Sequence, residues 1–140
     1  MGVEEMSGAA SPDEGDVYEA DGGRIIVNDE VVAFIATIEM VKVDGVITLS
    51  GRSSYSDYDG AKSKDVEKGI SVKINENRCS VAVEINIKYG ANVYDTARKL
   101  QRAIKNAIES YTGLVVERVD VTIRGMINEG TLPPAKNKAA

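Results

Sequence analysis

The middle of the chain alternates apolar and polar residues with the period of a β-strand. Ile70, Val72 and Ile74 alternate with polar residues, and the same alternation runs from Cys79 to Ile87. Successive side chains of a strand point to opposite faces of a sheet. The stretch therefore predicts a β-hairpin, connected by residues 75–78, with one buried face and one wetter face.

Two other stretches carry apolar residues at spacings of three and four, the period of a helix with one buried face. The first follows Asn28, whose side chain suits a helix N-cap and precedes two acidic residues. The second lies between Asn92, another capping residue, and Gly113, which suits the left-handed end of a helix. The apolar stripes expected to face the core are Val31, Phe34, Ile35, Ile38 and Val41 in the first helix, and Val93, Ala97, Leu100, Ile104, Ala107, Ile108 and Tyr111 in the second.

Further β-branched runs predict strands at 24–27, 46–50 and 115–124, and the stretch 51–69 is predicted to be a long polar loop. The predicted order is then β-α-β-β-β-α-β. Two helices with one apolar stripe each cover only one face of a sheet. We therefore expect an α+β two-layer sandwich, with both helices packed on one face of a mixed, mostly antiparallel sheet.

The two ends of the chain differ from this domain in composition. Residues 1–23 carry seven acidic and no basic side chains, with too little apolar material to offset the entropy of ordering them. We expect an acidic disordered tail over 1–23, a folded domain over 24–127 and a short disordered tail over 128–140. The formal net charge of −5 comes from the acidic tail, which serves solubility or acts as a docking segment.

Composition excludes several classes of function. The chain has no histidine, the usual general base and metal ligand, and its single cysteine falls in a predicted buried strand. It also lacks a glycine-rich phosphate loop and a pair of opposed acids. We therefore predict no enzymatic activity and no catalytic, cofactor-binding or metal-binding residue. The sequence has neither a secretion signal nor a long apolar span, so a cytoplasmic location is expected.

Several short phrases follow one another over about residues 23 to 126. They are Gly23-Arg24-Ile25, Glu30-Val31-Val32-Ala33, Val43-Asp44-Gly45-Val46, Lys68-Gly69-Ile70-Ser71-Val72, Ile87-Lys88-Tyr89-Gly90, Thr112-Gly113-Leu114 and Val119-Asp120-Val121. Together they resemble the alkaline shock protein family of envelope stress response proteins. The glycines in these phrases are explained by helix ends and strand breaks, so the shared residues specify the fold and do not point to a site.

The resemblance implies a cytoplasmic protein that supports the cell envelope under stress. In some relatives such a protein lies at the inner face of the membrane through a small membrane-anchored partner. The implied role is structural or scaffolding, exerted by self-association into a homo-oligomer or by docking to that partner. The resemblance carries no catalytic residue to this chain and implies no direct insertion into the membrane.

Candidate partner-binding residues lie in two places. Arg98, Arg102 and Lys105 share the face of the second helix opposite its apolar stripe, where they form a solvated face or bind an acidic tail, anionic lipid or RNA. Tyr55 and Tyr58 lie in the polar loop. Exposed tyrosines are enriched in protein interfaces, and a loop tyrosine that packs against its own domain is at least as common. A small RNA-associated module is the alternative function, but a nearly neutral domain without interleaved aromatic residues disfavours nucleic acid.

Overall fold

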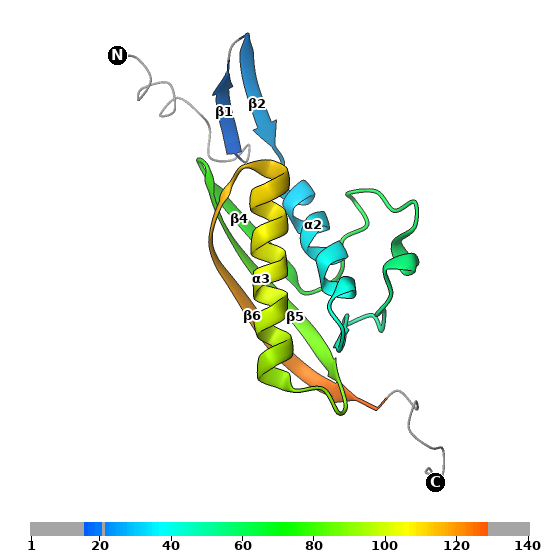
Figure 1. Cartoon of the computed structure of the whole chain (residues 1–140). Helices are drawn as coiled ribbons and strands as arrows, with labels where there is room; N and C mark the ends of the chain where they lie inside the picture. The colour runs from blue at the N-terminus through cyan, green and yellow to red at the C-terminus, as the bar shows by residue number, and fades with distance from the viewer. Residues whose placement is uncertain (1–15, 21, 129–140) are drawn as a thin grey trace.

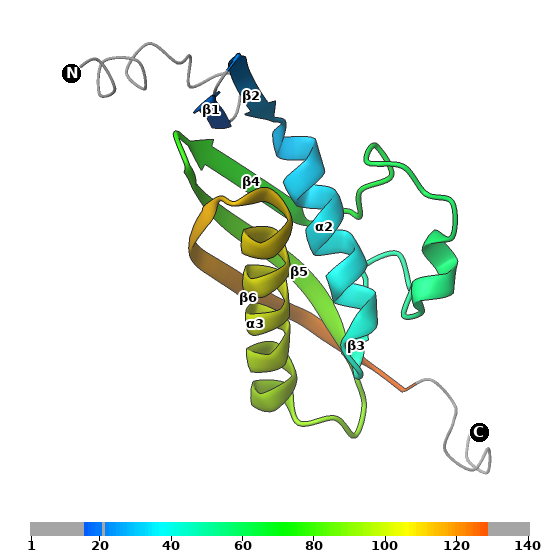
Figure 2. The same ribbon diagram turned by 45° about the horizontal axis from the view of Figure 1, so that its top comes forward.

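Two long helices lie against one face of a β-sheet in the computed structural model, which describes residues 16–20 and 22–128 (Figure 1). The elements in this part of the chain are β1 (Asp16–Ala20), β2 (Gly23–Val27), α2 (Asp29–Lys42), β3 (Val46–Ile47), the 3-10 helix η2 (Tyr55–Tyr58), β4 (Ile70–Asn75), β5 (Arg78–Lys88), α3 (Val93–Thr112) and β6 (Val115–Ile127). Figure 2 shows α2 and α3 side by side in front of the sheet. The predicted α+β class is confirmed.

Strand β5 is the centre of a four-stranded sheet. β6 runs parallel to β5 along one edge, whereas β4 and β3 pair antiparallel with the opposite edge, one after the other. A parallel neighbour requires a crossover connection, and α3 supplies it. Two of the three pairings are antiparallel, so the predicted mixed, mostly antiparallel sheet is confirmed.

The core lies between the sheet and the helices. The inward side chains of β5 are at most 1% exposed, and they are Cys79, Val81, Val83, Ile85 and Ile87. Each buried side chain of this size contributes about 1.5–3 kcal/mol. The alternation therefore fixes the register of the sheet, because a slip of one residue would turn all five side chains outward.

Two strands differ in extent from the sequence prediction. Asn75 pairs with Arg78, so only Glu76 and Asn77 connect β4 to β5 where a connection of four residues was predicted. The strand predicted over 46–50 ends at Ile47, because the chain turns there: the backbone N–H of Thr48 donates to the carbonyl of Arg52 at 2.8 Å.

Helix α3 has the boundaries that its capping residues predict. The side chain of Asn92 accepts a hydrogen bond from the backbone N–H of Asp95 at 2.9 Å. Gly113 ends the helix in the left-handed conformation, with φ at 79°. The middle of the predicted stripe, Leu100, Ile104 and Ile108, is completely buried.

Helix α2 begins at its predicted cap, Asn28, but is rotated about its axis from the predicted orientation. The side chains that it buries are Val32, Ala36, Thr37, Met40 and Val41. Of the predicted stripe, only Val41 is fully buried; Val31 is exposed, and Phe34, Ile35 and Ile38 are half-buried. The prediction was wrong because α2 is apolar around its whole circumference, so no polar face marked the solvent side.

The predicted tail and the predicted first strand also need correction. Asp16–Ala20 forms β1, which pairs antiparallel with β2, so this part of the segment 1–23 is a strand and not a disordered tail. The backbone hydrogen bonds of this ladder offset part of the entropy cost of ordering an acidic segment. β2 pairs with β1 and, within the described residues, not with the four-stranded sheet. Residues 1–15 and 21 of the predicted N-terminal tail, and all of 128–140 except Asn128, lie outside the described residues.

Candidate functional site

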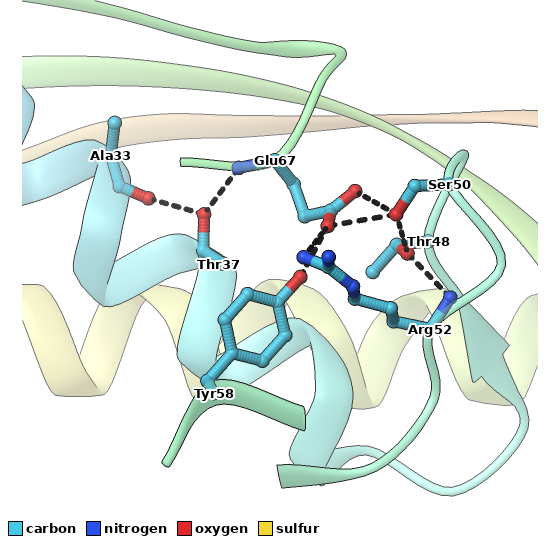
Figure 3. Close-up of polar contacts among 7 residues, drawn as sticks. All are labelled: Ala33, Thr37, Thr48, Ser50, Arg52, Tyr58 and Glu67. Atoms are coloured by element: carbon cyan, nitrogen blue, oxygen red, sulfur yellow. Dashed lines mark hydrogen bonds and ion pairs between the residues drawn. The ribbon is translucent and has the colours of Figure 1, made fainter. Parts of the chain in front are cut away.

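The loop between β3 and β4 is attached to α2 through a buried carboxylate (Figure 3). Glu67 is only 6% exposed, although most glutamates lie at the surface. The hydroxyl group of Tyr58 donates to Glu67 Oε2, and Ser50 Oγ donates at 2.9 Å to the carboxylate. Arg52 adds an ion pair, with Nη1 3.4 Å from Glu67 Oε2. A buried charge is costly unless it is paired and hydrogen-bonded, and this one is both.

The backbone around this carboxylate is held as firmly as its side chain. The N–H of Glu67 donates to Thr37 Oγ1 on α2 at 3.1 Å, and Thr37 Oγ1 donates to the carbonyl of Ala33 at 3.0 Å. At the other end of the loop, the N–H of Arg52 donates to Thr48 Oγ1 at 2.9 Å. These contacts hold the loop against α2. We call the residues that make them the polar cluster: Thr37, Thr48, Ser50, Arg52, Tyr58 and Glu67.

Tyr58 is therefore not the exposed contact residue that the sequence predicted. Its side chain is 5% exposed and the guanidinium group of Arg52 lies 5.3 Å from the centre of its ring. Burial and the hydrogen bond to Glu67 raise the pKa of Tyr58 to about 12, although Arg52 acts in the opposite direction. A phenol with this pKa stays neutral near pH 7, which suits a structural donor and not a nucleophile or a base.

The other predicted tyrosine stands at the surface. Tyr55 is 54% exposed, and the ammonium group of Lys42 lies 5.6 Å from the centre of its ring. Lys42 also pairs with Glu39, at 3.3 Å between Nζ and Oε2. Tyr55 is thus accessible for contact with a partner, and its role in binding stays a prediction.

The predicted basic residues of α3 are all exposed, and the structure adds a fourth basic side chain. Arg98, Arg102 and Lys105 lie along a groove of about 220 Å³ between α3 and β6, and Arg118 of β6 lines it from the other side. Lys105 pairs with Glu109 at 2.8 Å, and this contact, with the backbone N–H of Val116, lowers the pKa of Glu109. Sequence reasoning missed Arg118 because only the packing of α3 on β6 brings it to the helix.

A second region, formed by β2 and the start of α2, carries exposed apolar side chains. Ile25 and Ile26 of β2 are 56% and 46% exposed, and Val31 in the first turn of α2 is 39% exposed. Half-buried Phe34 and Ile38 lie on the same helical face as Val31, away from the face that carries Val32 and Met40. We call these five residues, Ile25, Ile26, Val31, Phe34 and Ile38, the apolar edge. It could not be predicted from the sequence, because Val31, Phe34 and Ile38 were expected in the core.

The acidic side chains and the cysteine of the described residues do not form a metal site. No three of them, buried Cys79 included, lie in a group that could hold a metal ion. The carboxylate of Glu67 accepts hydrogen bonds from the surrounding donors, and Tyr58 is a neutral donor to it. What the geometry presents is two accessible surfaces, the apolar edge and the α3–β6 groove.

Comparisons with known proteins concern the family of the chain and not a particular surface. In the part of the chain that the structure describes, no helix combines the length and apolarity that a bilayer crossing requires. Uncharacterized protein Spy1614 of Streptococcus pyogenes serotype M6 is 24% identical over 106 residues, which cover 74% of this chain and 88% of that protein. No solved structure matches the chain. Residues 18–128 match the alkaline shock protein 23 family, described by its cell envelope-related function, and the chain therefore belongs to this family.

Proposed function

We propose that this protein is a non-enzymatic scaffold of the cell envelope stress response, working through protein contacts on its surface. Its action would be self-association or docking to a membrane-anchored partner at the inner face of the membrane. The family's cell envelope-related function supports a role at the cell envelope. The observation that carries the proposal is the apolar edge, which leaves Ile25, Ile26 and Val31 in contact with water.

Exposed apolar side chains on neighbouring elements favour a protein partner. Apolar side chains scattered singly are normal on a surface, whereas adjoining ones mark interaction sites. Here β2 leads directly into α2, so residues 25, 26 and 31 are close in the chain, with Ile25 and Ile26 on opposite faces of β2. Burying them in an interface would contribute about 25 cal/mol for each Å² removed from water.

The polar cluster supports a scaffold over an enzyme. A catalytic carboxylate needs a free position for substrate, but Glu67 is buried and bonded to Tyr58, Ser50 and Arg52. These bonds hold the loop on α2, so Glu67 has a structural role.

Sedimentation velocity over a range of protein concentrations, combined with recovery of the protein in the membrane fraction after gentle lysis, tests this proposal. We expect either concentration-dependent oligomers or retention with a membrane protein, and loss of that behaviour in the double variant Ile25→Glu/Val31→Glu. The matched control Thr122→Glu/Ser71→Glu places two acidic residues at exposed positions of β6 and β4 and should leave association unchanged.

Two results would contradict the proposal. One is a strict monomer that is absent from the membrane fraction. The other is association that the apolar-edge variant and its control weaken equally. Salt-sensitive retention of the protein on immobilised RNA, without either form of association, would support the RNA-associated alternative.

A further inference from the structure

The groove between α3 and β6 has an apolar floor and a rim of four basic side chains and one acidic side chain, Glu117, which pairs with Arg78 at 3.0 Å. Its lining includes Val116 and Val119 of β6, which are 5% and 8% exposed. Gln101 links α3 to β6, because its Nε2 donates to the carbonyl of Val119 at 3.0 Å. The groove is thus a fixed feature of the packing of α3 on β6, which lie along each other in Figure 1.

The positive charge of this rim is only partly compensated. Lys105 pairs with Glu109 at 2.8 Å, and Arg118 pairs with Asp120 at 3.1 Å. Arg98 contacts the neutral amide of Gln101 at 3.4 Å instead. Among the side chains that the structure describes, neither Arg98 nor Arg102 forms an ion pair with an acidic group. Two guanidinium groups, one helical turn apart on the same face, therefore remain available to carboxylates.

The chain itself contains a segment of complementary charge. Residues 1–15 carry four carboxylates, Glu4, Glu5, Asp13 and Glu14, and no basic side chain. This segment is covalently joined to β1, and in both views the β1–β2 hairpin lies at the end of the molecule where α3 ends.

The segment is long enough to reach the groove. Fifteen extended residues span up to about 50 Å. The distance along α3 from Thr112 back to Arg98 is about 21 Å, at about 1.5 Å for each residue. Tethering also raises the effective concentration of the segment at the groove to the millimolar range.

We propose that the acidic segment 1–15 docks in cis in the α3–β6 groove, with its carboxylates on Arg98 and Arg102. Guanidinium and carboxylate groups form paired, charge-assisted hydrogen bonds. Each exposed pair contributes little, so the contact depends on the tether and is weakened by salt. The docked segment would cover the basic surface and exclude nucleic acid and anionic lipid from it. This proposal is independent of the scaffold function, because it does not involve the apolar edge.

Paramagnetic relaxation enhancement on the full-length protein tests the docking. A nitroxide on Ala9→Cys would report which backbone amides the segment approaches; Cys79 is 1% exposed and stays unlabelled in the native protein. At low ionic strength we expect selective broadening of the amides of residues 98–105 and 116–119. The broadening should disappear at about 0.5 M salt, where the Debye length is only a few Å.

Charge variants identify the contact. The variant Arg98→Gln/Arg102→Gln should lose the broadening, and so should the tail variant Glu4→Gln/Glu5→Gln/Asp13→Asn/Glu14→Gln. The matched control Lys62→Gln/Lys64→Gln removes the same two charges from exposed positions of the 51–69 loop and should keep it.

Three outcomes would overturn the proposal. The broadening could be absent, or spread evenly over the surface, or unchanged in the Arg98→Gln/Arg102→Gln variant. A mixture of isotope-labelled protein without nitroxide and unlabelled protein with nitroxide distinguishes docking within one molecule from docking between two molecules. Equal broadening in this mixture would assign the groove to the tail of a second copy and contradict docking in cis.

Discussion

Glu67 shows how one buried charge organises a loop of this protein. Its carboxylate accepts hydrogen bonds from Tyr58 and Ser50 and pairs with Arg52, and its backbone is bonded to Thr37 of α2. The loop therefore depends on polar contacts as much as on apolar burial. Removing a single donor leaves the remaining charge undersatisfied, which costs more than the hydrogen bond itself contributed.

Replacing Tyr58 with phenylalanine isolates one of these donors. We expect Tyr58→Phe to lower the free energy of unfolding by about 1–3 kcal/mol, because the buried carboxylate loses a donor while the ring is kept. Urea denaturation followed by circular dichroism measures this difference. Tyr55→Phe is the matched control: it removes the same hydroxyl from a side chain that is 54% exposed, and should change stability by less than about 0.5 kcal/mol. Equal effects of the two variants would contradict the role assigned to Tyr58.

The raised pKa of Tyr58 predicts how this contribution depends on pH. Folding raises the pKa from about 10 in the unfolded chain to about 12. A group with a raised pKa stabilises the fold fully below the unfolded value and loses that contribution as pH rises through the folded value. The stability difference between the wild type and Tyr58→Phe should therefore be constant up to about pH 10 and shrink between pH 10 and 12. A difference that shrinks already between pH 7 and 9 would contradict this assignment.

At the scale of elements, the predictions succeeded where periodicity and caps agreed. α3 has a polar face, an N-cap at Asn92 and a glycine stop, so its ends and the middle of its buried face could be predicted. The ends of the predicted stripe were wrong, because Val93 and Tyr111 are 38% and 69% exposed. α2 has a cap at Asn28 but apolar residues all round, so its start could be predicted and its orientation could not. The β1–β2 ladder was missed because a strand held by backbone pairing leaves no apolar alternation in an acidic segment.

Two glycines with a left-handed backbone conformation allow the cost of backbone strain to be distinguished from the cost of close packing. A Cβ at Gly69, with φ at 82°, would lie 3.0 Å from both Glu84 Cβ and Leu49 Cδ1, whereas one at Gly60, with φ at 75°, would meet nothing within 4 Å. Gly60→Ala should cost about 1–2 kcal/mol from strain alone. We expect Gly69→Ala to cost clearly more, since the loop end and β5 must also move apart. Thermal unfolding of both variants tests this, and equal losses would refute the close packing at Gly69.

The outer edge of β6 has features that discourage strand pairing between molecules. Within the described residues, no strand pairs with the outer edge of β6. Register shifts near Cys79 and Ile85 leave Glu117 and Arg124 as extra residues in β6, and bulges and charged side chains blunt an exposed edge. We therefore expect self-association to use the apolar edge and not sheet extension.

At the scale of the whole molecule, the candidate surfaces depend on packing that local sequence does not encode. Arg118 lies near Arg98 and Arg102 only because β6 packs along α3. Val31 is exposed only because α2 packs against the core with another of its faces. The sequence did predict the basic row of α3 and the exposed Tyr55. It misplaced Tyr58, since nothing in a polar loop distinguishes a buried tyrosine from an exposed one.

Site-specific photocrosslinking in intact cells tests most directly whether the apolar edge is the working surface of the protein. A photoreactive residue at Ile25 should crosslink to another protein, either a second copy or a membrane-anchored partner. The same residue at Thr122, exposed on β6, should give no such product. Absence of protein adducts at Ile25, or the same adducts from both positions, would contradict the account.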